Sequence, residues 1–279
     1  MIEENKVLLI DADSLIYFVA HLETVEEAIL KLDERISNIF TANGSNEYVM
    51  FLTGKDCFRY KVAKSAPYKG NRVGRDKPKW LKVITQYMIA KYNAVYYAGL
   101  EADDCVTYFH NKIPNTRICA IDKDILLSTE GTHFNYGMKK IEGTEPQEWE
   151  FKGFITTTKL EADNGLYLQM MMGDSGDNIP GLKGIGEAKA LRILGTIYSS
   201  EAFEIGQTEI NEEILNIYVT TYGVSEGITK FAETFRLVYM LRTDEDCMRE
   251  VGYIPELPTI QISVVKEHSH EDDDDSVNW

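Results

Sequence analysis

The hydrophobic residues of the chain fall into short runs that are separated by longer amphipathic stretches. Apolar runs at 6–10, 47–53, 94–97 and 116–121 are typical of buried strands. The stretches between these runs carry the spacing of apolar residues that is typical of helices. Strands that alternate with helices predict an α/β fold, in which right-handed crossovers connect the strands of a parallel central sheet with flanking helices.

Two helix starts are indicated near the N-terminus. Ser14 is the expected N-cap of a helix over residues 15–22. Thr24 is followed three residues later by Glu27, a spacing that resembles a capping box and opens a longer helix reaching about residue 40. These two helices supply the amphipathic pattern between the first two strands.

The pattern becomes mostly helical in the second half of the chain. We therefore expect an α/β core over residues 1–162 and a helical region over 163–250, with no internal repeat. The expected helices of this region lie at 164–173, 186–194, 209–221 and 226–242. The acidic residues 267–279 lack apolar content and are expected to be disordered.

Composition and length are those of a compact soluble protein. The chain has 279 residues, of which 44% are hydrophobic, and no apolar run approaches the ~18 residues that a membrane helix requires. Because Met1–Lys6 leads directly into the first strand, we expect no signal peptide and a cytoplasmic location. The four cysteines are widely spaced, which predicts reduced thiols and neither disulfides nor a zinc site.

The net charge of −16 is distributed unevenly along the chain. Much of the excess comes from clustered acids and from the acidic tail, so the remainder is nearly neutral. Residues 55–82 contain ten Lys and Arg residues against only Asp56 and Asp76. The core of this segment, Tyr68–Gly74, is polar and glycine-rich, so we expect an exposed, mobile loop that faces phosphate groups.

Eight carboxylates stand where apolar runs stop or where helices begin. In a parallel α/β sheet such positions meet at one edge, where these folds place their active sites. Carboxylates packed this closely would repel one another unless divalent cations neutralised them, and Mg²⁺ and Mn²⁺ prefer oxygen ligands. The candidate ligands are Asp11, Glu101, Asp103, Asp104, Asp122, Asp124, Asp174 and Asp177.

A glycine-rich segment follows the last acidic cluster. In Gly184-Ile185-Gly186, the absence of a Cβ lets backbone N–H groups approach a phosphate, and Lys183 and Lys189 add positive charge. This pattern is typical of a helix-hairpin-helix, which grips one strand of a duplex through its backbone without reading sequence.

Taken together, these motifs resemble those of the 5′-nuclease and flap-endonuclease family, which includes stand-alone phage enzymes and the N-terminal nuclease domain of bacterial DNA polymerase I. The resemblance covers most of residues 6–242. It rests on Leu9-Ile-Asp-Ala-Asp13, Tyr68-Lys-Gly-Asn-Arg72, Gly99-Leu-Glu-Ala-Asp-Asp104, Ile121-Asp-Lys-Asp124 and the segment from Met172 through Gly186.

The resemblance implies a PIN-like (resolvase-like) nuclease core with a basic arch at about 55–92, and two Mg²⁺ or Mn²⁺ ions. Asp11, Glu101, Asp103 and Asp104 would hold the first ion, and Asp122, Asp124, Asp174 and Asp177 the second. Lys69 and Arg72 would contact the scissile phosphate. Tyr68, Lys183, Gly184, Gly186 and Lys189 would bind DNA, and K⁺ would bind at the hairpin.

The implied activity is 5′-3′ exonuclease and structure-specific flap cleavage during replication or repair. Its substrate would be DNA with a flap, a nick or a 5′ end, and RNA–DNA hybrids at primers are a further candidate. The acidic tail would dock on a replication partner or serve only to keep the protein soluble.

The sequence departs from the family pattern at one ligand. The family places an aspartate at the end of the second strand, where this chain has Leu52 followed by Thr53. Asp56 is a candidate substitute, although it lies in the turn beyond the strand. Asp13 is interpreted as a helix cap that points away from the metal and is left out of the ligand set.

Two other interpretations use the same residues. In a haloacid-dehalogenase-type phosphatase, Asp11 would be a covalent nucleophile and Thr53 would have a role, but the other acidic clusters would have none. In a non-catalytic DNA-binding relative, the metal site would have lost its function together with the missing aspartate.

Overall fold

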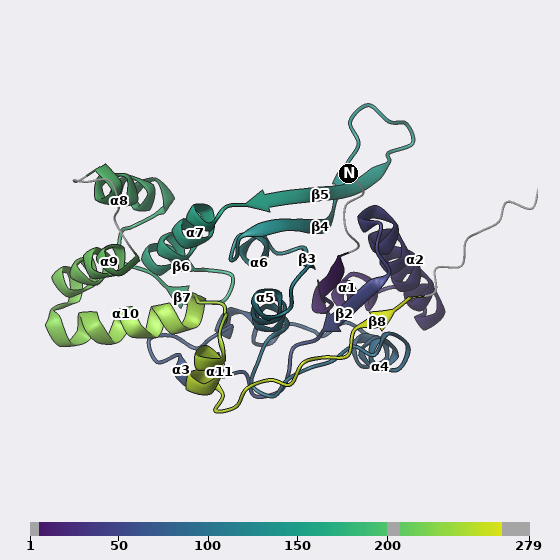
Figure 1. Ribbon diagram of the computed structural model, residues 1–279, viewed down its shortest axis with the longest axis horizontal. Helices are drawn as coiled ribbons and strands as arrows, with labels where there is room; N and C mark the ends of the chain where they lie inside the picture. The colour runs from purple at the N-terminus through teal and green to yellow at the C-terminus, as the bar shows by residue number, and fades with distance from the viewer. Residues whose placement is uncertain (1–5, 200–206, 264–279) are drawn as a thin grey trace, which may run out of the picture.

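The computed structural model describes residues 6–199 and 207–263. Its main sheet has six strands in the order β5-β4-β3-β1-β2-β8 (Figure 1). The strands are β1 (Val7–Asp11), β2 (Glu47–Phe51), β3 (Thr116–Ala120), β4 (Gly131–Lys140), β5 (Trp149–Thr157) and β8 (Gln261–Ile262). The four central strands are parallel, and β5 and β8 are antiparallel at the two edges. The predicted α/β fold with a mostly parallel sheet is confirmed.

Alternate residues of the central strands enter two separate cores, because successive side chains of a strand point to opposite faces. Leu8 and Ile10 pack with α1 (Asp13–Val19), α2 (Val25–Asn43) and α4 (Leu81–Tyr92). Leu9 and Val49 pack on the other face with α5 (Ala102–Lys112), α6 (Lys123–Leu126) and helices from the second half of the chain. With both faces covered, β1 and β3 are buried along their whole length.

The second half of the chain is helical, as predicted, and lies to the left of the sheet in Figure 1. Its helices are α7 (Lys159–Met172), α8 (Glu187–Ser199), α9 (Gln207–Tyr222), α10 (Val224–Val238) and α11 (Asp244–Glu250). A two-stranded sheet of β6 (Gly173–Asp174) and β7 (Ile179–Pro180) stands between α7 and α8. Tyr218, Leu237 and Met170 bury their side chains in the core that continues under the main sheet.

Several local predictions are corrected. Residues 94–97 do not form a strand, because only Val95 pairs with Phe51, as an isolated bridge. Ser14 is not an N-cap, since α1 already begins at Asp13. Thr24 does cap α2, accepting a hydrogen bond from the Glu27 N–H at 3.1 Å. The β4–β5 hairpin was not predicted, and the acidic tail at 267–279 lies outside the described residues.

The basic segment at 55–82 is more structured than its composition predicts. It contains α3 (Arg59–Val62), the short 3₁₀ helix η1 (Gly70–Arg72) and the start of α4. Most of its Lys and Arg side chains are exposed, but Arg59 is buried with 1% of its surface accessible. Tyr68 is also buried, at 4%, so the expectation that Tyr68–Gly74 is exposed throughout is wrong for its first residue.

The structure also shows the state of the cysteines and the character of the helices. All four cysteines are free, and all four are buried. Among the helices of the described ranges, none has the length and apolar character needed to cross a bilayer.

We expect Phe51→Ala to lower the free energy of unfolding by about 3–5 kcal/mol, because it removes a buried ring and leaves a cavity. Phe51 is fully buried and stacks on Phe109 at a ring-centroid distance of 5.3 Å. Leu30→Ala, at an α2 position that is 66% exposed, should change stability by no more than about 0.5 kcal/mol. Urea denaturation of both variants measures the difference, and equal losses would contradict the assigned packing.

Candidate metal centre and nucleic-acid interface

The predicted metal ligands meet at the carboxyl edge of the sheet. Asp11 ends β1, and Asp122 follows β3, its neighbour in the sheet. The negative charge of Asp122 is close enough to act on Asp11, and those of Asp122 and Asp174 act on Asp124. A single hollow is lined by carboxylates from three separate segments: Asp103, Asp122, Asp124, Asp174 and Asp177. The structure thus brings together acids that are far apart in the sequence.

The start of α5 supplies the densest group of carboxylates. Glu101 is the N-cap, and it forms a reciprocal capping box with Asp104. One ligand atom from each of Glu101, Asp103 and Asp104 lies within 4.8 Å of the others, an arrangement that could hold a metal ion. Glu101 and Asp104 are 4% and 0% exposed. Acids in a first helical turn are favoured by the helix dipole, but that role does not require the burial of Glu101 and Asp104.

Lys69 and Tyr68 reach this group from the basic segment. Lys69 Nζ donates to Glu101 Oε1 at 2.5 Å, and the Tyr68 hydroxyl lies 2.6 Å from Glu101 Oε2 and 2.9 Å from Asp177 Oδ2. Burial alone would lower the pKa of Lys69, but the carboxylates of Glu101 and Asp103 raise it above its usual value. Lys69 therefore remains a cation beside the acidic hollow.

The loop that carries Lys69 is fastened to the segment after β6. The Lys69 N–H donates to the carbonyl of Asp177 at 2.8 Å, and Asn71 Nδ2 donates to the carbonyl of Ser175 at 2.8 Å. Asn178 Nδ2 completes the attachment by donating to the carbonyl of Pro67 at 2.8 Å. Arg72 forms an ion pair with Asp177. These bonds hold Lys69 in a left-handed backbone conformation, φ 53°, which is uncommon for a residue with a side chain.

Arg59 was counted with the exposed basic residues, but it lies beneath the centre. Its guanidinium group donates to both oxygens of Asp104 and to Glu101 Oε2. It also donates to the carbonyls of Leu237 and Tyr239, so it joins α3 and α5 to the end of α10. Charge patterns along a sequence do not report burial, and no sequence signal distinguished this arginine from its neighbours.

The centre carries more negative charge than its cations balance. Burial, followed by the charge of Asp13, raises the pKa of Asp11 to about 8. Burial and the charge of Asp122 raise the pKa of Asp124 to about 6, and burial and Glu101 raise that of Asp103. The neighbouring cations within the described residues include Arg59, Lys69, Arg72 and Lys123, fewer than the carboxylates gathered here. Oxygen donors short of positive charge fit a divalent cation such as Mg²⁺ or Mn²⁺.

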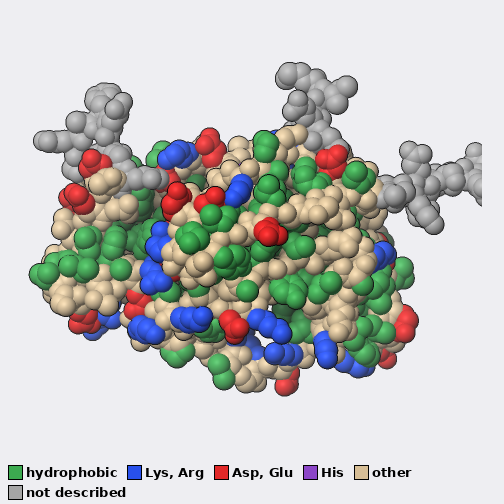
Figure 2. Space-filling model, turned by 60° about the horizontal axis from the view of Figure 1, so that its bottom comes forward, with side chains coloured by type: hydrophobic (Ala, Val, Ile, Leu, Met, Phe, Trp, Pro, Cys, Tyr) green, Lys and Arg blue, Asp and Glu red, His purple; other side chains and the backbone are tan. Residues whose placement is uncertain are grey.

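The glycine-rich hairpin lies at the surface before α8. Gly184 has φ +74°, and a Cβ built at Gly184 or Gly186 meets no atom within 4 Å. Lys183 and Lys189 are exposed beside it. The predicted helix-hairpin-helix is corrected in one respect, because β6 and β7 also lie between the two helices. Figure 2 shows Lys and Arg side chains gathered along the lower face of the molecule, where a polyanion could approach.

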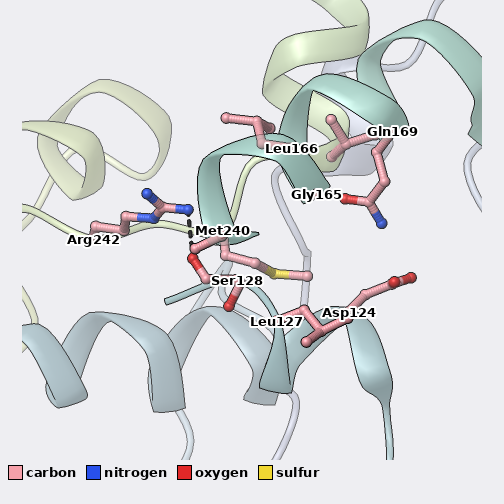
Figure 3. Close-up of a pocket in the computed structure, with 10 residues that line it drawn as sticks. Asp124, Leu127, Ser128, Gly165, Leu166, Gln169, Met240 and Arg242 are labelled. Atoms are coloured by element: carbon pink, nitrogen blue, oxygen red, sulfur yellow. Dashed lines mark hydrogen bonds between the residues drawn. The ribbon is translucent and has the colours of Figure 1, made fainter. Parts of the chain in front are cut away.

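A second hollow adjoins the acidic one and was not predicted. Figure 3 shows Asp124 and Gln169 pointing toward the same side of it, while Arg242 donates to the carbonyl of Ser128. Asp124, Gln169, Val238 and Met240 line both hollows. The position of Gln169 one turn before the end of α7 could have indicated a role, because this helix leads directly into Asp174.

The chain is similar to proteins named DNA polymerase I, 5′-3′ exonuclease and flap endonuclease. No family model matches the chain. It is 27% identical to DNA polymerase I of Bacillus subtilis (strain 168) over 227 aligned positions, and the match covers 72% of this chain but 24% of the polymerase. It is 26% identical to the 5′-3′ exonuclease of Bacillus subtilis (strain 168), covering 68% of this chain and 70% of that protein. Flap endonuclease Xni of Shewanella baltica is 24% identical, over 70% of this chain and 76% of that protein.

Solved structures of similar fold agree with these relatives. The bacteriophage T5 D15 protein co-crystallised with metal ions has a TM-score of 0.54 at 16% identity, covering 84% of this chain and 89% of that chain. The resemblance to the 5′-nuclease and flap-endonuclease family is confirmed. Human GEN1 in complex with Holliday junction DNA has a TM-score of 0.51 at 13% identity, covering 92% of this chain and 64% of that chain.

The structure changes the interpretation of Asp13 and leaves Asp56 in the turn beyond β2, as expected. Asp13 does not cap α1: the N-cap is Ala12, with no side-chain cap, and Asp13 Oδ1 instead accepts from the N–H of Thr53 at 3.2 Å. Asp56 has an exposed side chain in a turn with φ 60°. The metal-binding, catalytic and DNA-binding roles assigned from the sequence stay predictions.

In the absence of metal, the free energy of unfolding should fall as pH rises from about 4 to about 8. The unfolded chain releases the Asp11 proton near the ordinary pKa of 3.8, whereas the folded protein holds it up to about 8. The folded state therefore binds more protons across this window, and each rise in pH disfavours it. Urea denaturation in EDTA measures this decline.

Asp11→Asn removes this ionisation, so its stability should decline less over the same window. Asp76→Asn changes an exposed carboxylate of the basic segment and should decline as the wild type does. Equal declines in the wild type and Asp11→Asn would contradict the assignment of a raised pKa to Asp11.

Proposed function

We propose that the protein is a metal-dependent 5′-3′ exonuclease and structure-specific flap endonuclease that hydrolyses phosphodiester bonds in DNA. The observation that carries this proposal is the meeting of carboxylates from distant segments in one hollow, with Lys69 at its side. Relatives named 5′-3′ exonuclease and flap endonuclease support it. So does the T5 D15 flap endonuclease solved with DNA and metal ions, which has a TM-score of 0.51.

The carboxylates would hold two divalent ions, Mg²⁺ or Mn²⁺. When bound, such ions polarise the phosphodiester and lower the pKa of the attacking water. The predicted donors are Asp11, Glu101, Asp103 and Asp104 for the first ion and Asp122, Asp124, Asp174 and Asp177 for the second. The excess of buried negative charge supports this assignment.

Lys69 and Arg72 would act on the phosphate itself. Lys69 stays protonated beside Glu101, and Arg72 is half-exposed beside Asp177, so both place positive charge at the mouth of the hollow. Fixed cations at this point would stabilise charge that develops on the non-bridging oxygens. Tyr68 would orient the carboxylates of Glu101 and Asp177 through its hydroxyl rather than stack on a base, because its ring is buried.

DNA would be held without reading its sequence. The exposed hairpin with Lys183 and Lys189 would contact one backbone strand, and the exposed Lys and Arg residues of 55–82 would attract phosphates near the metal centre. We further propose flaps, nicks and 5′ ends as substrates, with RNA–DNA hybrids as a second class. Binding of K⁺ at the hairpin and docking of a replication partner on the acidic tail rest on the family resemblance and on tail composition.

The phosphatase alternative is not favoured by the environment of Asp11. A covalent nucleophile must reach its substrate, whereas Asp11 is 7% exposed and its neighbours include Asp13 and Asp122. The phosphatase reaction would also assign no role to the carboxylates of Asp124 and Asp174, which line the acidic hollow.

Asp174→Ala should reduce nuclease activity by about 100-fold or more, the scale of losing one fixed electrostatic contact to the transition state. The assay compares a 5′-labelled flap, a nicked duplex and an RNA-primed duplex, with Mg²⁺ and with EDTA. Asp76→Ala, an exposed carboxylate in the basic segment, is the matched control and should keep wild-type activity. Activity that survives Asp174→Ala would defeat the site, and binding of flap DNA without cleavage by the wild type would favour the non-catalytic alternative.

Gly186→Ala should weaken DNA binding about threefold to tenfold, because the added Cβ separates the backbone from a phosphate. It should not alter stability, since this Cβ meets no protein atom within 4 Å. Gly195→Ala, within α8 and equally free of contacts, should bind DNA as the wild type does. Fluorescence anisotropy and the melting temperature measure the two effects, and unchanged binding by Gly186→Ala would exclude the hairpin from the interface.

A further inference from the structure

Asp104 has little capacity left for a cation. A carboxylate offers about four acceptor sites. In Asp104 these face the two terminal nitrogens of Arg59, the N–H of Leu241 at 3.3 Å and the N–H of Glu101 at 3.5 Å. The side chain is fully buried, and the Arg59 guanidinium already balances its charge. Asp104 thus acts as the partner of Arg59, which reduces the number of carboxylates free to bind the first ion.

Asp13 lies where an additional carboxylate is needed. Its N–H donates to Asp11 Oδ1 at 3.2 Å, which places the two acids side by side at the end of β1. Its own Oδ1 accepts from the N–H of Thr53 at 3.2 Å, so its carboxylate reaches across to the end of β2. This is the strand end at which the chain has Leu52 and Thr53 instead of an acid.

Thr53 fixes this carboxylate relative to the other ligands. While the Thr53 N–H binds Asp13, its hydroxyl oxygen accepts from the N–H of Ala102 at 3.1 Å, next to Glu101. One residue therefore connects the ends of β1 and β2 to the start of α5. Asp56, the other candidate substitute, is exposed in the following turn.

We propose that Asp13 is a metal-binding residue of the first site, in the place of the carboxylate that β2 lacks, with Thr53 as its positioning residue. Asp11 and Asp13 would offer oxygen ligands to Mg²⁺ or Mn²⁺, while Asp104 neutralises Arg59 beneath them. This inference rests on the proposed function, because it assumes that the acidic hollow binds divalent ions.

The test is calorimetric titration of the metal-free full chain with Mn²⁺, without DNA. Asp13→Asn keeps an oxygen acceptor for the Thr53 N–H but removes the charge, so Mn²⁺ affinity should fall roughly 10-fold to 100-fold, the scale seen when support of a metal site is lost. Asp56→Asn is the matched control and should bind Mn²⁺ as the wild type does. The double variant with Asp13→Asn and Thr53→Asp returns a carboxylate to the end of β2 and should recover most of the lost affinity.

The outcomes separate this inference from the proposed function. Wild-type affinity in Asp13→Asn, together with a loss of affinity in Asp11→Asn, would overturn the role of Asp13 while leaving the metal centre in place. A wild-type protein that binds no Mn²⁺ would overturn both. If Asp13→Asn also lowers the melting temperature in EDTA, the double variant decides: recovered affinity supports a ligand role, and unrecovered affinity overturns it.

Discussion

The buried ion pair between Arg59 and Asp104 determines how the metal centre is built. Both side chains are almost fully buried, and two parallel hydrogen bonds join them. Removing one partner of such a pair leaves an uncompensated charge, which typically costs about 3–5 kcal/mol. Because Arg59 also binds the carbonyls of Leu237 and Tyr239, this pair joins the basic segment, α5 and the helical region at one point. The start of α5, with Glu101 and Asp103, is held in place from below.

Above this pair lies an excess of negative charge, which lowers the free energy of unfolding when no metal is bound. The pKa values of Asp11 and Asp124 are raised because ionisation is unfavourable in these buried surroundings. A cation that binds the folded state more tightly than the unfolded chain raises the free energy of unfolding and offsets this loss. Metal binding and folding are therefore linked, and the protons released by these acids make the linkage dependent on pH.

The sequence predicted the meeting of the acids because the ends of parallel strands share one edge of a sheet. Its errors have physical causes. Asp13 was treated as a continuation of an extended strand, whereas Ala12 already has helical backbone angles (φ −92°, ψ −8°), which turns the Asp13 side chain toward β2. The burial of Arg59 was not predicted, because a run of basic residues shows the sign of charge but not its burial. The β4–β5 hairpin was missed although its strands carry the alternation typical of half-buried strands, with Phe134, Tyr136 and Met138 at every second position of β4.

The attachments of the basic segment at its two ends limit how far the loop between them can extend from the surface. At one end Arg72 pairs with Asp177, and at the other the N–H and the indole nitrogen of Trp80 donate to the carbonyls of Ala20 and Leu22. Beyond it, α4 belongs to the core, so residues 73–79 form the part of the predicted arch that lies between these two attachments. Seven residues extend to roughly 25 Å at most and must return to a fixed end, which keeps their tip within about half that distance of the surface. The exposed Arg75 and Lys77 therefore stay within this distance of the surface, where they can attract phosphate groups. Lys79 is held at the other end, since its Nζ donates to the carbonyl of Glu23 at 3.3 Å.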